Sequence, residues 1–223
     1  MKPWIHNVIL MSSVGMIITG LLLLIPPAAW PRMTAPQDGR VIELANSRTG
    51  GGYSALSDSG VSKAIYFDDE ILLRASKDGS TYCCGFTFEI VMQLAQERGL
   101  LKGKSYIEMK RFQKQWYGAE PGSNKRQVAM AMENLGIGRE ISLDNARPGD
   151  FVIYSRTGPR GIGHSVVLID TIRRDGKVIG LYYRSSQPTT NGIGNQTEYL
   201  SDTGYSNGTI RRDTIVAARL DAK

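Results

Sequence analysis

Apolar side chains recur at helical spacing between residues 82 and 98. They share one broad face, which consists of Phe86, Ile90, Val91, Leu94 and Ala95. Polar residues, Glu89 among them, fall on the other side of the predicted helix. The turn residues of 78–81 supply candidate N-caps, and Gly99 ends the pattern in the position of a C-terminal cap. This segment is the best-defined predicted helix of the chain.

Two more helices and a sheet are predicted further along the chain. Segments 105–117 and 124–135 have helical patterns. From Arg147 onward, short apolar runs alternate with turn residues, which is typical of strands. The predicted strands are 151–154, 164–170, 178–187 and 214–218. A turn at 173–177 joins the middle two as a hairpin, and 191–194 is predicted to be a loop. Helices followed by an antiparallel sheet predict an α+β domain.

The first 31 residues form an apolar segment in which Lys2 carries the only charged side chain. Its length fits both a cleaved signal peptide and a membrane anchor. Both alternatives export the rest of the chain to the periplasm, the extracellular space or the outer face of a membrane. The membrane is a partner only if the segment is not cleaved. Residues 32–60 contain Gly- and Ser-rich stretches and are predicted to be a linker and entry segment, which leaves 61–223 as the folded domain.

The overall composition is that of an ordinary folded protein, with 41% hydrophobic and 22% charged residues among 223. The net charge of +6 suits an anionic environment such as a cell wall or a membrane surface. The sequence has no basic stripe interleaved with aromatic residues, so a nucleic-acid partner is not expected.

The two cysteines of the chain, Cys83 and Cys84, are neighbours in the first turn of the helix predicted at 82–98. Adjacent cysteines cannot form an ordinary structural disulfide, because their Cβ atoms are poorly placed for one. They are therefore packing residues, a strained redox pair or catalytic groups. A helix N-terminus favours a thiolate and can hold an oxyanion, so the position suits nucleophilic catalysis. Helical periodicity does not distinguish between the two cysteines.

The candidate base is His164, because the other histidine, His6, lies in the apolar N-terminal segment. His164 begins a predicted strand after a Gly-rich loop, where sites are common, although a lone structural histidine is the alternative. The returning strand of the hairpin ends beside it. Gln187 there can orient the imidazole through its amide oxygen, and Ser185 or Ser186 could do so more weakly. One usable histidine and adjacent cysteines disfavour a zinc site, and no cofactor is indicated.

Three short motifs occur in a recognisable order. Residues 82–86 read Tyr-Cys-Cys-Gly-Phe, residues 147–154 begin Arg-Pro-Gly-Asp, and residues 163–170 begin Gly-His. They resemble the Cys-x-Gly-Phe helix start, the Pro-Gly-Asp strand entry and the Gly-His strand of NlpC-type and CHAP-type cell-wall hydrolases. These hydrolases belong to the papain-like cysteine peptidase superfamily.

The resemblance implies a papain-like fold for 61–223, with N-terminal helices packed on an antiparallel sheet. It also implies a cysteine peptidase or amidase that cleaves amide bonds, often in peptidoglycan, through a thioester on Cys83 with His164 as base. Only the resemblance favours Cys83 over its neighbour. The chain departs from the family in three places, one of which is that its middle helices are longer than in the shortest family members. Tyr82 stands where NlpC-type enzymes often have Asp, and Gln187 is placed by the hairpin, not by a motif.

Three other functions fit the same residues. A thioester-forming acyltransferase on the same fold would use an amine or alcohol in place of water. A non-catalytic wall-binding module would keep the fold, and its Cys83 would be inert to alkylating reagents at neutral pH. A redox protein would oxidise Cys83 and Cys84 reversibly and would not need His164.

Overall fold

The computed structural model describes residues 38–121, 126–158 and 163–222. The predicted signal peptide or anchor at 1–31 lies outside these residues. Among the helices that the structure does describe, none is long and apolar enough to cross a membrane.

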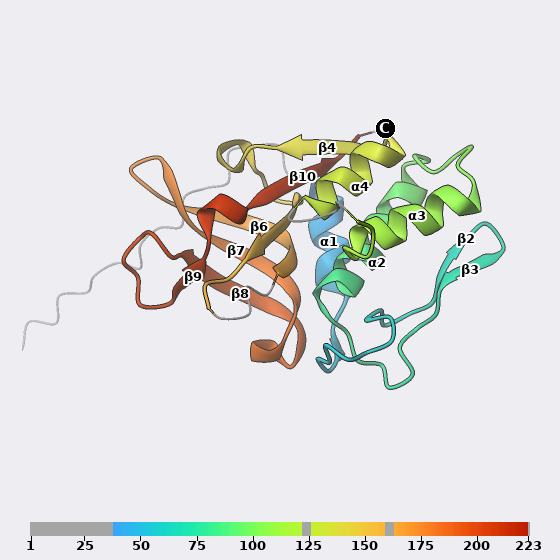
Figure 1. Ribbon diagram of the computed structural model, residues 1–223, viewed down its shortest axis with the longest axis horizontal. Helices are drawn as coiled ribbons and strands as arrows, with labels where there is room; N and C mark the ends of the chain where they lie inside the picture. Colours follow the sequence, from blue (N-terminus) through green and yellow to red (C-terminus); the bar gives the residue numbers. More distant parts are fainter. Residues whose placement is uncertain (1–37, 122–125, 159–162, 223) are drawn as a thin grey trace, which may run out of the picture. The chain divides into compact units, whose positions relative to one another are not determined.

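One large sheet and a group of helices beside it make up the fold (Figure 1). The helices are α1 (Gly39–Ser47), α2 (Cys83–Glu97), α3 (Tyr106–Trp116) and α4 (Gln127–Leu135). The strands of the sheet are β1 (Gly50–Gly51), β4 (Gly138–Ile141), β5 (Phe151–Ser155), β6 (Gly163–Arg174), β7 (Lys177–Gln187), β8 (Gly192–Leu200), β9 (Gly208–Ile210) and β10 (Val216–Leu220). A separate hairpin pairs β2 (Ile65–Phe67) with β3 (Glu70–Leu73).

The strands follow the order β1-β8-β7-β6-β5-β10-β4, and β9 lies beside β8. All of these pairs are antiparallel except β8 with β9. Strand β5 divides the core in two. Phe151 and Ile153 join the apolar cluster on the helix side, whereas Val152 and Tyr154 join a second cluster on the opposite face. The alternation follows from the two-residue period of a strand, and it places buried apolar side chains on both faces of β5.

Helix α2 is the central element, since ten of its 15 residues are buried. The prediction that Glu89 lies on a solvent-facing side is wrong, because Glu89 is among the buried residues. Its carboxylate accepts hydrogen bonds from the backbone N–H and the hydroxyl of Ser62, and it lies 3.4 Å from the Arg48 guanidinium. These contacts compensate the loss of water around a buried carboxylate.

The α+β class and the antiparallel sheet predicted from the sequence are confirmed. Helix α2 matches the helix predicted at 82–98 to within one residue at each end. Strands β6 and β7 form the predicted hairpin. Two predictions are wrong. Segment 191–194 is not a loop, because β8 begins at Gly192. The described part of 32–60 is not a linker, because it contains α1 and belongs to the same compact unit as the rest.

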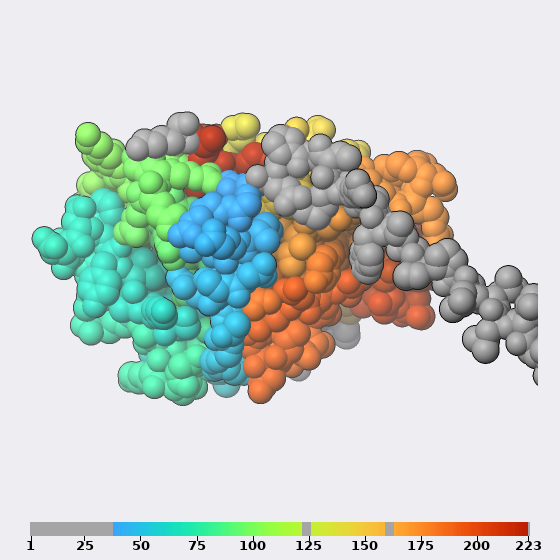
Figure 2. Space-filling view, turned by 180° about the vertical axis from the view of Figure 1, so that it is seen from behind, coloured from blue at the N-terminus to red at the C-terminus, as the bar shows by residue number. Residues whose placement is uncertain are grey.

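Helix α1 is held against the sheet by both apolar and polar contacts. Val41, Leu44 and Ala45 are buried. Arg184 of β7 donates to the carbonyl oxygens of Ala45 and Arg48 at 2.9 and 2.8 Å. A cation at the C-terminal end of a helix satisfies carbonyl groups that have no partner within the helix. Figure 2 shows α1 in blue, between the cyan part of the chain and the orange strands of the sheet.

Candidate active site

Both cysteines of the chain lie at the N-terminus of α2. Its N-cap residue is Tyr82, in extended conformation, and no side chain caps the first turn. The expectation that a residue of 78–81 caps this helix is therefore wrong. The backbone N–H groups of the first turn carry the positive end of the helix dipole, and Cys83 and Cys84 are the first two residues of that turn.

A close backbone contact fixes where α2 begins. A Cβ atom on Gly85 would lie 2.0 Å from the carbonyl oxygen of Gly60, so only glycine fits at this position. The same Gly60 oxygen accepts a hydrogen bond from the backbone N–H of Tyr82 at 3.4 Å. Gly60 has φ +66°, and a Cβ there would overlap the Tyr82 ring. Packing thus requires a glycine two positions after Cys83. Its close contact with Gly60 fixes the position of the helix start.

His164 lies at the start of β6, next to the N-terminus of α2. It is 4% exposed and pairs in register with Tyr154 of β5. The rings of Tyr154 and Tyr183 stand edge to face against the imidazole, each with its centroid 5.7 Å away. The imidazole is therefore held between two aromatic walls, with its nitrogens left for polar partners.

Gln187 is the polar partner that the hairpin places beside His164. Its Oε1 lies 3.0 Å from His164 Nε2, and both side chains are buried. The other two candidates have different partners. The Ser185 hydroxyl donates to the backbone oxygen of Ser165 at 2.7 Å, and the Ser186 hydroxyl pairs with that of Thr81 at 2.7 Å. Among the three candidates, the structure thus brings only Gln187 to the imidazole.

The thiol of Cys83 is poised to ionise. Its pKa is lowered well below the ordinary value, first by a hydrogen bond from Cys84. Burial opposes this, but the hydrogen bond and positive charge of His164 and the backbone N–H of Ser165 lower it further. The pKa of Cys84 moves the other way, because its thiol donates to Cys83 and is desolvated. The two sulfur atoms are 3.9 Å apart, and both residues are half-buried.

A buried charge network supports the aromatic walls. The Glu198 carboxylate of β8 accepts hydrogen bonds from the hydroxyls of Tyr154 and Tyr183 at 2.9 and 2.8 Å. The Arg156 guanidinium donates two hydrogen bonds to the same carboxylate, at 2.7 and 2.8 Å. This bidentate ion pair balances the buried negative charge. The network fixes the two rings that flank His164. No local pattern in the sequence reveals the network, since its members are separated along the chain and belong to no motif.

Tyr53 is a second side chain near Cys83 that no sequence pattern indicates. It belongs to a segment that pairs with Thr81, since the Ser54 N–H donates to Thr81 and the Thr81 N–H donates to Gly52, at 3.1 and 3.0 Å. Burial raises the pKa of the Tyr53 phenol, and the negative charge of Cys83 raises it further. A neutral hydroxyl thus lies close enough to the nucleophilic sulfur to experience its charge. No sequence signal identifies it, because the three glycines before it give the segment the pattern of a linker.

The Pro-Gly-Asp segment has a structural explanation. Asp150 is buried and accepts from the Arg147 backbone N–H at 2.7 Å and from the Arg219 guanidinium at 2.7 and 2.8 Å. Gly149 has φ +93°, and a Cβ there would lie 2.9 Å from the Cβ of Asp38. The motif therefore anchors the entry to β5 against β10 and α1 and does not contact the reacting groups.

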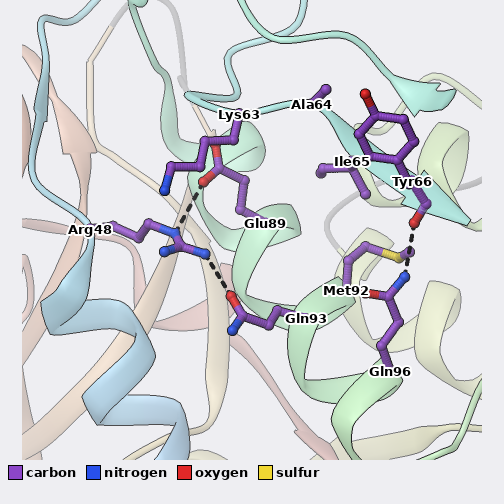
Figure 3. Close-up of a pocket in the computed structure, with 9 residues that line it drawn as sticks. All are labelled: Arg48, Lys63, Ala64, Ile65, Tyr66, Glu89, Met92, Gln93 and Gln96. Carbon is purple, nitrogen blue, oxygen red and sulfur yellow. Dashed lines mark hydrogen bonds and ion pairs between the residues drawn. The ribbon is translucent and has the colours of Figure 1, made fainter.

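A pocket of about 260 Å³ lies on another side of α2 (Figure 3). Its lining consists of Arg48, Lys63, Ala64, Ile65, Tyr66, Glu89, Met92, Gln93 and Gln96. Arg48 pairs with Glu89 at its polar side and donates to Gln93 at 2.6 Å. Burial raises the pKa of Glu89. The pocket shares no lining residue with the pair of Cys83 and His164, so it is separate from the candidate active site.

These contacts bring a thiol, an imidazole and an amide together at the start of α2. In the described part of the chain, no group of three or more His, Cys, Asp or Glu side chains could hold a metal ion. The arrangement combines a thiol of lowered pKa, a buried imidazole that helps to lower it, and an amide that bonds to this imidazole. Comparisons with protein-family models, curated proteins and solved structures found no match to this chain.

Proposed function

We propose that this protein is a cysteine hydrolase that cleaves amide bonds through a thioester intermediate. Cys83 is the nucleophile, His164 the general base and acid, and Gln187 the residue that orients the imidazole. One observation carries the proposal: a single buried imidazole interacts with the Cys83 thiol and with Gln187 Oε1, 3.0 Å from its Nε2. Because Nε2 is taken by Gln187, Nδ1 is the nitrogen left to exchange a proton with the thiol.

The site residues support a reaction in two halves. In the first half, the Cys83 thiolate attacks the amide carbon, and backbone N–H groups at the start of α2 stabilise the oxyanion. The imidazolium of His164 donates its proton to the leaving nitrogen as the C–N bond breaks. In the second half, His164 takes a proton from water, the hydroxide adds to the thioester, and the thiolate leaves. The products are an amine and a carboxylic acid.

The proposed substrate is peptidoglycan, and the proposed fold is papain-like. Support for both comes from the resemblance of three motifs to NlpC-type and CHAP-type hydrolases. The net charge of +6 suits an anionic wall polymer. The apolar segment at 1–31 would export the enzyme to that substrate. A helix that begins at the nucleophile beside an antiparallel sheet is the arrangement expected of papain-like enzymes.

The test is cleavage of purified peptidoglycan by the full-length protein at neutral pH. Mass spectrometry of the soluble fragments identifies which amide bond is cut. We expect cleavage by wild type, a loss of about a thousandfold or more in Cys83→Ala, and partial activity in Cys84→Ala. No cleavage by any form contradicts the wall substrate, and loss only in Cys84→Ala contradicts the choice of nucleophile. A parallel reaction with an added amine distinguishes hydrolysis from acyl transfer, since an acyltransferase forms mainly the new amide whereas a hydrolase releases mainly the carboxylic acid.

A further inference from the structure

The second thiol of the site has a defined place in a hydrogen-bond chain. The Cys84 sulfur has two hydrogen-bond contacts within the described residues, with Cys83 Sγ and with Gln127 Nε2, both at 3.9 Å. Gln127 is the first residue of α4, and its Nε2 also donates to the carbonyl oxygen of Trp116 at 3.3 Å. An amide nitrogen only donates, so the Cys84 sulfur accepts from Gln127.

The direction of the remaining bond follows from charge. Two thiolates 3.9 Å apart would repel each other in a partly buried site, so only one of the two cysteines ionises at neutral pH. Cys83 is the one whose pKa is lowered by His164 and by the Ser165 backbone N–H, both of which favour a negative sulfur. Cys84 therefore keeps its proton, and its S–H points to Cys83.

We propose that Cys84 is a positioning residue whose thiol, oriented by Gln127, donates a hydrogen bond to the Cys83 thiolate and keeps Cys83 ionised at neutral pH. The chain of donors runs from Gln127 N–H to Cys84 S–H to Cys83 sulfur. Each bond polarises the next, because a donor that itself accepts a hydrogen bond donates more strongly. The catalytic meaning of this inference rests on the proposed function, but the thiol chemistry itself does not.

The arrangement also assigns separate roles to two adjacent cysteines that periodicity could not distinguish. Cys83 and Cys84 lose their protons in two coupled steps, and the pKa of Cys84 is raised for the same reason that the pKa of Cys83 is lowered. Cys84 is therefore a poor nucleophile at neutral pH although it lies beside the reacting atoms. Serine at position 84 would retain an O–H donor, whereas alanine would not.

The test is the pH dependence of Cys83 alkylation by iodoacetamide in the full-length protein, with fragment-ion mass spectrometry to assign the modified cysteine. We expect Cys84→Ser to keep a midpoint close to that of wild type. We expect Cys84→Ala to raise the midpoint by about one unit, which is about a tenfold slower reaction at a pH below both midpoints. The matched control is Ser80→Ala. It removes a buried hydroxyl that bonds to Asp78 at 2.6 Å, and it should leave the midpoint unchanged.

Gln127→Ala tests the inference independently, because this variant keeps both cysteines. We expect it to raise the Cys83 midpoint by a smaller amount in the same direction, and it carries the test if Cys84→Ala fails to fold by circular dichroism. The inference is overturned if these variants leave the midpoint unchanged, if Cys84→Ser shifts it as far as Cys84→Ala, or if Cys84 reacts faster than Cys83. Alkylation requires no substrate. A shift in Cys84→Ala without peptidoglycan cleavage would thus reject the proposed function and keep this inference.

Discussion

The Nε2 atom of His164 lies 3.0 Å from Oε1 of Gln187, at the adjoining ends of two antiparallel strands. An amide oxygen only accepts, so Nε2 carries the hydrogen and the ring is fixed in one orientation. A neutral amide restrains the ring without adding a negative charge beside the Cys83 sulfur.

Gln187→Ala is expected to lower the rate of amide hydrolysis about tenfold to a hundredfold, the range of one hydrogen bond to a charged group. The rate constant at saturating peptidoglycan measures the effect. The control is Thr189→Ala, two residues further on, whose exposed hydroxyl bonds only to the Gln196 amide among the described residues. Full activity in Gln187→Ala would exclude Gln187 as the orienting residue.

The start of α2 makes a second prediction, for stability. Gly85→Ala places a Cβ 2.0 Å from the Gly60 carbonyl oxygen, so the helix start or the preceding chain must move. We expect the free energy of unfolding to fall by about 1–3 kcal/mol, measured by urea titration. Gly163→Ala is the matched control, because its Cβ would come no closer than 3.9 Å to another residue, the Tyr154 oxygen. Equal stability of the two variants would contradict the packing explanation of the Cys-x-Gly spacing.

Local pattern was enough to predict the elements that carry the site. The helical period at 82–98 located α2, and the hairpin turn at 173–177 placed the end of β7 beside His164. The position of Gln187 followed from this pairing, since the side-chain period of a strand is two. Elements with strong periodicity or defined turns are thus the ones that the sequence predicts.

Long-range polar contacts explain what the sequence did not predict. Glu89 has the pattern of a surface residue, because the partners of its buried carboxylate, Ser62 and Arg48, are far from it in the sequence. The pairing of Arg156 with Glu198 joins residues 42 positions apart and leaves no local pattern. Helix α1 was missed because its nine residues are flanked by glycines and polar residues that are typical of a linker.

The anchor of β5 makes a third prediction. Asp150→Ala leaves the Arg219 guanidinium without its carboxylate in a partly buried place and is expected to cost about 3 kcal/mol of stability. The control is Asp213→Ala, which removes an exposed partner of Arg211 and should change stability by less than about 0.5 kcal/mol. Thermal unfolding of both variants measures the difference. A small effect of Asp150→Ala would mean that the Pro-Gly-Asp motif does not anchor this strand.

The charge network behind His164 makes a prediction about pH. Burial raises the pKa of the Glu198 carboxyl, but hydrogen bonds from Arg156 and Thr209 outweigh it and bring the pKa to about 2. The folded pKa is thus below the ordinary value of 4.5. The stabilisation is therefore complete above pH 4.5 and is lost as the pH falls toward 2. The shift of roughly 2.5 units corresponds to about 3 kcal/mol.

Urea unfolding of wild type and Glu198→Gln between pH 7 and pH 2.5 tests this linkage. At pH 7 the variant is expected to be less stable by about 3 kcal/mol. The gap should close as the pH falls below 4.5, because protonated Glu198 resembles the amide. Asp202→Asn, at an exposed carboxylate paired with Arg212, controls for charge loss alone and should shift stability by less than about 0.5 kcal/mol. If the difference in free energy of unfolding between wild type and Glu198→Gln stays constant over the whole pH range, the variant is destabilised by altered packing and not by the loss of a charge.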